Sequence, residues 1–318
     1  MNKTIALLLA TLALPALALP ALAQDLPKVS IGMSGWTGFA PLSLAEKAGI
    51  FKKNGVDVTI KMIPQKDRHL AIASGDVQCA ATTVETYINW NAAGVGITQV
   101  VQLDKSYGAD GLAARNSIAK IADLKGKTVG VDAPGTSSYF GLGWILKKNG
   151  MSMKDIKITT LSPQAAASAF NAGTEIDAAM TYEPYLSSVR ENKTAGRIIA
   201  TTLDYPMVMD TFGCTPKFIK DNGKLVQAMV NSYFEALEMI KKEPAKSNEI
   251  MGSVVKQTGD AFAKSSAFLR WQDKEANKKF FAGEIQTFSK EAADLLLEMG
   301  IIKTIPNLNS LVDTSFIK

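Results

Sequence analysis

SGWTGFAPLSLAEKAGIFKKNGVDV, residues 34–58, joins one predicted strand to a helix and then to a second strand. The apolar run at 29–33 predicts the first strand, which ends at the Gly-Trp-Thr-Gly turn. Pro41 stands where the first turn of a helix tolerates proline, and Gly49 is a candidate cap at the far end. Alternating apolar residues at 56–62 predict the next strand. This strand–helix–strand unit is the building block of an α/β fold.

The same alternation continues along the chain with short connections. Further strands are predicted at 77–81 and 97–103, and helices at 66–74 and 84–93. The rhythm then restarts, with strands at 128–131, 156–160 and 178–181 and helices at 137–149 and 164–172. The pattern predicts mixed, mostly parallel sheets flanked by helices, arranged as two α/β units in series.

A segment rich in glycine and polar residues at 104–115 lies between these units, and a second segment that is also predicted to be irregular, 203–216, follows the second unit. After the second segment the pattern is mainly helical, and we expect this C-terminal part to return to the first unit. The prediction is therefore a first lobe made of residues 24–108 and 209–318, and a second lobe made of residues 109–208. Two chain crossings form a hinge that lets such lobes close on a ligand.

The N-terminus has the pattern of a secretory signal peptide at residues 1–23. Lys3 supplies the positive charge, an apolar run follows at 5–19, and Ala21-Leu22-Ala23 is a small-residue cleavage site. The run is short and interrupted by proline, which argues against a transmembrane anchor. Removing 23 residues from 318 leaves 295, a length that suits two lobes. We expect an exported, periplasmic protein.

Composition excludes several other classes. The formal charge is +5, but the basic residues are scattered in pairs, so nucleic acid is not an expected partner. One histidine and two cysteines give no metal-binding spacing, and neither a metal nor a cofactor is expected. Cys79 and Cys214 both lie in strand-like stretches. An oxidising compartment permits a disulfide between them, and buried free thiols are the alternative.

Six stretches carry a resemblance to a known family. They are PLSLAEKAGIFKKNGVDV (41–58), AIASGDVQCAATT (71–83), IADLKGKTVGV (121–131), GTSSYF (135–140), AFNAGTEIDAAMTYEPY (169–185) and GIIKTIPNLNSLVDTSFI (300–317). In this order the chain resembles the periplasmic solute-binding proteins of ABC importers for nitrate, taurine, aliphatic sulfonates and thiamine precursors. The resemblance implies the two-lobed type II periplasmic binding protein fold, a ligand in the interlobe cleft, no catalysis, and docking onto a membrane permease.

Candidate ligand-binding residues follow from the fold class. In open α/β sheets, ligands bind beyond the carboxyl ends of the strands. Residues there offer hydroxyls, carboxylates, aromatic rings and the free N–H groups of a helix start. The candidates after strands and at helix starts are Trp36, Thr37, Glu85, Thr136, Ser137, Ser138, Tyr182 and Glu183, and the candidates on the two crossings are Asp110 and Asp210. For each of them a structural role, in packing, capping or a surface turn, is the alternative.

The charges among these candidates indicate the ligand's chemistry. Four of them are carboxylates, and Arg115 is the only arginine expected nearby. An oxyanion site would show more arginine or lysine, whereas buried carboxylates need a cationic partner. We therefore expect a small nitrogen-containing solute, either a taurine-like zwitterion or an amine or guanidinium cation. The helix start at Ser137 would take the acidic end of a zwitterion. An aliphatic sulfonate, nitrate or a thiamine precursor is the alternative.

Two other classes compete with a transport protein. A fungal thiamine-pyrimidine synthase shares the fold of the family and consumes a histidine and pyridoxal phosphate, and His69 is the only histidine here. The Cys-rich motif of that enzyme is absent and the export signal argues against it, so no catalytic residue is predicted. A sensory ligand-binding module would have the same capture chemistry. We expect instead a monomer that delivers its ligand to an ABC permease in the inner membrane.

Overall fold

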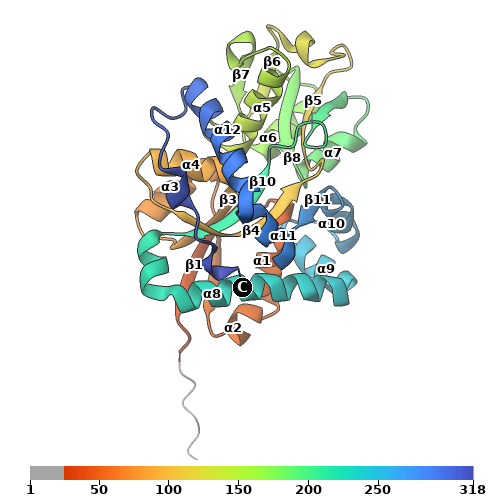
Figure 1. Cartoon of the computed structure of the whole chain (residues 1–318). Coiled ribbons are helices and arrows are strands. Elements are labelled where there is room, and N and C mark those ends of the chain that lie inside the picture. Colours follow the sequence, from red (N-terminus) through yellow and green to blue (C-terminus); the bar gives the residue numbers. More distant parts are fainter. Residues whose placement is uncertain (1–24, 318) are drawn as a thin grey trace, which may run out of the picture.

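The computed structural model describes residues 25–317 and contains two β-sheets with helices packed around them (Figure 1). The predicted signal peptide at 1–23 lies outside the described residues. Within the described range, no helix has the length and apolar character needed to cross a membrane.

The larger sheet has the strand order β11-β4-β10-β3-β1-β2. Its strands are β1 (Lys28–Met33), β2 (Asp57–Met62), β3 (Cys79–Thr83), β4 (Thr98–Ser106), β10 (Met209–Cys214) and β11 (Leu269–Trp271). β1 is parallel to β2 and β3, whereas β10 is antiparallel to β3 and β4. The helices α1 (Ala40–Lys47), α2 (Ile50–Lys53), α3 (Gln65–Ala73), α4 (Val84–Ala92), α8 (Pro216–Lys242), α9 (Pro244–Val254), α10 (Gly259–Ser266) and α11 (Lys274–Lys279) accompany it.

The smaller sheet has the order β7-β6-β8-β5-β9. Its strands are β5 (Asp110–Ala114), β6 (Thr128–Val131), β7 (Lys157–Thr160), β8 (Ala178–Tyr182) and β9 (Arg197–Thr201), and its helices are α5 (Ser137–Lys148), α6 (Pro163–Ala172) and α7 (Tyr185–Glu191). β6 is parallel to β7 and β8, and β5 is antiparallel to β8 and β9. The predicted α/β class with mixed sheets flanked by helices is confirmed. Most antiparallel pairs involve β5 and β10, the two strands that follow directly after the chain passes from one sheet to the other.

The two crossings between the sheets are more regular than the sequence predicts. β4 continues to Ser106 and β5 begins at Asp110, so only residues 107–109 lie between them. The return crossing occupies 202–208, between β9 and β10. The hydroxyls of Ser106 and Thr202 are 2.7 Å apart, and the Ser106 N–H donates to the Val208 carbonyl. The two crossings therefore lie side by side, and the prediction of irregular structure over 104–115 was wrong because both ends extend sheet pairings.

The C-terminal part contacts both sheets' helices. α12 (Ile285–Glu298) packs against α4 and also against α5. The Phe288 ring lies 6.5 Å from the Phe140 ring and 6.0 Å from the Trp144 ring of α5, measured between centroids. The assignment of all of 209–318 to the first lobe stays a prediction. It depends on α12, because this helix packs against helices of both sheets.

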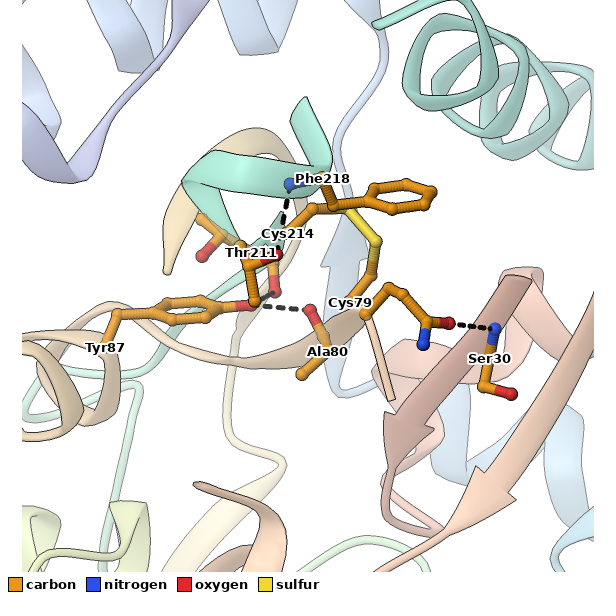
Figure 2. Close-up of a disulfide and its surroundings, with 9 residues drawn as sticks. Ser30, Cys79, Ala80, Tyr87, Thr211, Cys214 and Phe218 are labelled. Carbon is orange, nitrogen blue, oxygen red and sulfur yellow. Dashed lines mark hydrogen bonds between the residues drawn. A yellow bond between two sulfur atoms is a disulfide. The ribbon is translucent and has the colours of Figure 1, made fainter. Parts of the chain in front are cut away.

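A disulfide joins Cys79 on β3 to Cys214 on β10 (Figure 2). The two residues are direct cross-strand partners, and neither is exposed. Close by, the Tyr87 hydroxyl donates to the carbonyls of Ala80 and Thr211 on the same two strands. Of the two alternatives that the sequence left open, the structure contains the bridge. It spans 135 residues, a span that includes every strand of the smaller sheet.

Candidate functional site

A small cavity lies between the two sheets, where β1, β3 and β8 end and β5 begins. About 20 Å³ is open to atom centres inside it. It is lined by Ser34, Trp36, Phe39, Gln65, Arg68, Thr82, Thr83, Asp110, Ser137, Tyr182, Val208 and Asp210. Five of the ten predicted ligand residues are in this lining: Trp36, Asp110, Ser137, Tyr182 and Asp210. A larger hollow of about 570 Å³ beside α12 contains none of the ten.

The Gly-Trp-Thr-Gly turn places Trp36 in the wall of the cavity. The Trp36 Nε1–H donates to the Asp104 carboxylate, with N···O distances of 3.2 and 3.4 Å. The Trp36 ring meets the Tyr182 ring edge to face at 5.4 Å between centroids, so it connects the larger sheet to the smaller one. A Cβ on Gly38 would stand 2.1 Å from the Asp104 Oδ2 and 2.2 Å from the Trp36 Nε1. The turn needs glycine at 38 because the Trp36–Asp104 hydrogen bond passes directly beside it.

Gly38→Ala is therefore expected to destabilise the protein by about 1–3 kcal/mol, the usual cost of inserting a methyl group into a closely packed site. The methyl group would push the Trp36 ring away from Asp104. Urea unfolding followed by tryptophan fluorescence measures the loss. Gly223→Ala is the control, since a Cβ there meets no atom within 4 Å. A Gly38→Ala protein as stable as the control would contradict this assignment.

Four buried carboxyl groups, each at most 2% exposed, lie at or behind the cavity wall. Asp110 and Asp210 line the cavity, and Glu85 and Asp104 lie behind the lining residues Thr83 and Trp36. Asp210 on β10 is the cross-strand partner of Asp104 on β4 and of Thr83 on β3. After burial, repulsion from Asp104 contributes to the raised pKa of Asp210. Glu85, in the first turn of α4, reaches the cavity wall through Thr83, whose hydroxyl donates to the Glu85 Oε1. The described residues contain no group of His, Cys, Asp or Glu that could hold a metal ion.

Three of these carboxyl groups have an oxygen that no protein group satisfies. The Glu85 Oε2, Asp110 Oδ2 and Asp210 Oδ2 are buried and have no hydrogen-bond partner within residues 25–317. A buried polar atom left without a partner costs about 1–3 kcal/mol, and more if it is charged. The protein therefore carries an excess of acceptors at one place, which a ligand rich in donors would satisfy.

Burial also raises the pKa of each of these groups. It raises the pKa of Glu85 to about 8, with a smaller contribution from the nearby Asp110 charge. It raises the pKa of Asp110 to about 7, with repulsion from Glu183 adding to the effect. The pKa of Asp210 lies well above its usual value because of burial, followed by repulsion from Asp104 and Asp110. Because burial disfavours the charged form, these groups favour their neutral forms.

The raised pKa values predict that the unliganded protein loses stability as the pH rises. The folded state holds protons on Glu85 and Asp110 up to about pH 7–8, whereas the unfolded chain releases them near pH 4. The free energy of unfolding should therefore fall between pH 5 and pH 8. Urea unfolding across this range tests the sign, and Asp110→Asn should flatten the slope. A free energy of unfolding that rises over the same range would contradict the prediction.

Arg68 is the arginine at the cavity, and the prediction that Arg115 is the only one nearby was wrong. Arg68 is 1% exposed and donates to the carbonyls of Ile63 and Ala81. Burial lowers its pKa to about 10. Arg115 instead donates to the carbonyls of Phe170, Ile176 and Ala195, beside the smaller sheet. One feature of the sequence could have indicated that Arg68 is buried. Arg68 and the apolar Ile72 are four residues apart, which puts both on the same face of α3.

The start of α5 is already occupied by a side chain from the other sheet's helix α3. The Gln65 Oε1 accepts from the Ser137 N–H at 3.2 Å and from the Ser137 hydroxyl at 3.0 Å. The Gln65 Nε2 donates to Thr82 and Thr86. Gln65 thus bridges the two halves of the cavity, a role that the sequence did not reveal because glutamine at a helix start is usually solvated.

The remaining predicted residues lie behind the cavity lining. Thr37, Thr136 and Ser138 are buried, and the Thr136 hydroxyl donates to the Ala133 carbonyl. Glu183 is 0% exposed, and its carboxylate accepts from the Ser187 N–H and hydroxyl and pairs with Arg190 at 3.3 Å. Direct ligand contact by these four residues stays a prediction.

The chain is similar in sequence and in fold to known proteins. The family model NMT1/THI5 like matches residues 36–247. A binding protein of Brucella abortus is 25% identical over 306 residues, which cover 92% of each chain. The taurine-binding periplasmic protein of Escherichia coli is 24% identical over 247 residues, covering 74% of this chain and 76% of its own.

A solved structure shows the same fold. The alkanesulfonate-binding protein SsuA from Xanthomonas axonopodis pv. citri, bound to MOPS, superposes with a TM-score of 0.77 at 19% identity, over 92% of this chain and 100% of its own. At this identity the likeness establishes the periplasmic binding protein fold. The coarse class that these relatives share is that of a solute-binding protein, not of an enzyme. With two thirds of its length matched by the family model, the chain belongs to the NMT1/THI5-like family.

Proposed function

We propose that this protein captures a small nitrogen-containing cation in the periplasm and delivers it to the permease of an ABC importer. The observation that carries the proposal is a set of three buried, unpartnered carboxyl oxygens: those of Asp110 and Asp210, which line the cavity, and that of Glu85, which bonds the lining residue Thr83. A cation with N–H donors would satisfy these oxygens and offset their charge. The proposal includes the signal peptide at 1–23 and action as a monomer.

A zwitterion of the taurine type fits the cavity less well than a cation. The predicted place for its acidic end was the start of α5, but Gln65 already bonds the N–H and hydroxyl of Ser137 there. The small space open to atom centres also leaves little room for an ethyl chain and a tetrahedral sulfonate. A zwitterion would require Gln65 to move and the cavity to widen.

An oxyanion is the second candidate, and two observations favour it. Relatives of this chain are named for taurine and alkanesulfonate. Arg68 lines the cavity and uses only part of its set of five N–H donors on protein carbonyls. Against this stand four carboxyl groups to one arginine, and each carboxyl group that ionises repels an anion.

Closure of two lobes over the ligand is the mechanism that we propose. Contacts between the two sheets' residues would form on closure, namely Gln65 with Ser137, Trp36 with Tyr182, and the Asn89 side chain with the Gly135 carbonyl. Closure excludes water and strengthens the polar contacts inside. A ligand shifts the population toward the closed form only by its preference for that form.

Isothermal titration of the purified protein with methylammonium, guanidinium, taurine, methanesulfonate and nitrate tests the function. Binding of at least one of the two cations, with none or much weaker binding of the two anions, is the expected result. Tight binding of methanesulfonate or nitrate in the absence of cation binding would overturn the cation and favour the oxyanion.

A further inference from the structure

We infer that the ligand is a planar, trigonal cation, with guanidinium as the parent compound, held at its edge by Glu85, Asp110 and Asp210. This inference rests on the proposed function and names the substrate class of the same cavity. Three independent features of the cavity support it: the arrangement of its free acceptors, its size, and its aromatic walls.

The free acceptors lie on three elements of the fold, α4, β5 and β10. The Glu85 Oε1 accepts from the Thr83 hydroxyl, the Asp110 backbone N–H donates to the Ser106 hydroxyl oxygen, and Asp210 is the cross-strand partner of Asp104. Each of the three carboxyl groups has one buried oxygen that remains unpartnered in the described part of the chain. Guanidinium carries an NH₂ group at each of three corners, and all of its hydrogen-bonding groups are donors. Three carboxylates with one open oxygen each match this pattern.

The size of the cavity matches a ligand of this kind. The cavity offers about 20 Å³ to the centre of a group the size of a water molecule, the volume of a sphere about 1.7 Å in radius. The nitrogen atoms of guanidinium lie about 1.3 Å from its carbon, because delocalised C–N bonds are short. A longer alkylamine would extend beyond this space.

The walls and the charge balance complete the argument. Trp36, Phe39 and Tyr182 bring three aromatic rings to the cavity. A flat, weakly hydrated cation gains more from such rings than a compact ammonium ion does, because it can stack on them. Arg68 is the one basic side chain in the lining, against four carboxyl groups at or behind the cavity wall. A monovalent cation therefore offsets charge that Arg68 leaves unpaired when these groups ionise.

Guanidinium, urea and nitrate are all planar and trigonal, but the first is a cation, the second is neutral and the third is an anion. Comparing their binding therefore tests the effect of ligand charge at constant shape. Calorimetric titration should show guanidinium binding about 100-fold or more tightly than urea and nitrate, because only guanidinium pairs with buried carboxylates. Guanidinium should also bind more tightly than methylammonium, which has the same charge but a tetrahedral donor group. All titrations stay at concentrations far below those that denature proteins.

A pair of variants links the binding to the cavity. Asp110→Asn should weaken guanidinium binding by at least about tenfold, since it removes one carboxylate from the edge of the ligand. Asp76→Asn, which alters an exposed carboxylate paired with Lys61, is the matched control and should bind like the unaltered protein.

Each outcome of these titrations has a definite meaning. Methylammonium binding as tightly as guanidinium, or more tightly, overturns the planar ligand and leaves the cation-binding function standing. Guanidinium failing to bind at millimolar concentration also overturns the inference, and binding of nitrate or methanesulfonate in its place overturns the proposed function as well. Guanidinium binding that Asp110→Asn does not weaken shows that the site lies elsewhere.

Discussion

Asp210→Asn is expected to weaken cation binding by roughly 30-fold to several thousandfold, which corresponds to about 2–5 kcal/mol for removing one partner of a buried charge pair. Asp210 lies at the centre of the acidic cluster, because it is the cross-strand partner of Asp104 and is repelled by Asp104, Asp110 and Glu85. Its Oδ2 lacks a partner in residues 25–317 and its side chain lines the cavity. Calorimetric titration with guanidinium or methylammonium measures the loss.

The same substitution should act in the opposite direction on the unliganded protein. Asparagine removes a charge that neighbouring carboxylates repel, so the melting temperature without ligand should stay the same or rise at pH 8. The shift in melting temperature on adding the cation should nearly vanish. Asp76→Asn serves as the surface control for both measurements. A variant that unfolds more easily but keeps its affinity would show that Asp210 has a structural role only.

The Cys79→Ala/Cys214→Ala double variant is expected to lose about 5 kcal/mol of stability, the chain-entropy value for a bridge that closes a loop of 135 residues. The bridge joins β3 to β10, the two strands that present Thr83 and Asp210 to the cavity. Without it, the unfolded chain gains the freedom of the whole segment that contains the smaller sheet. Urea unfolding in the absence of reductant gives the difference.

Reduction of the unaltered protein provides the control for that measurement. If the bridge itself is responsible, the unaltered protein in strong reductant should approach the stability of the double variant, and the double variant should not respond to reductant. A loss below about 1 kcal/mol would contradict the entropic account and would indicate that strand pairing alone holds β3 against β10.

The class of the site and part of its composition were predictable from the sequence. Trp36, Tyr182 and Ser137 follow strand ends or begin a helix, and local patterns locate such positions. Asp110 and Asp210 stood out because each lies near the end of a segment that crosses between the two units. The sequence also predicted an acidic site, because carboxylates outnumber basic residues at those positions.

The residues that the sequence did not reveal reach the cavity through pairings distant in the chain. Asp104 lies within a strand and becomes part of the site only because β10 places Asp210 opposite it. Arg68 and Gln65 lie on a helix whose pattern is mostly polar, and only its packing shows which side faces inward. For the same reason the sequence could not decide whether the two cysteines form a disulfide, since 135 residues separate them.

The sequence by itself determined the α/β class and the family, and it predicted the strand ends at which a ligand would lie, because these depend on short-range patterns of apolar residues, glycine and proline. Only the tertiary structure decided which side chains share the cavity, which of their oxygens stay unpartnered, and how small the enclosed space is. Those properties depend on strand register and on contacts between the two sheets. Strand register and these contacts bring together residues that lie far apart in the sequence, and no local sequence pattern connects such residues.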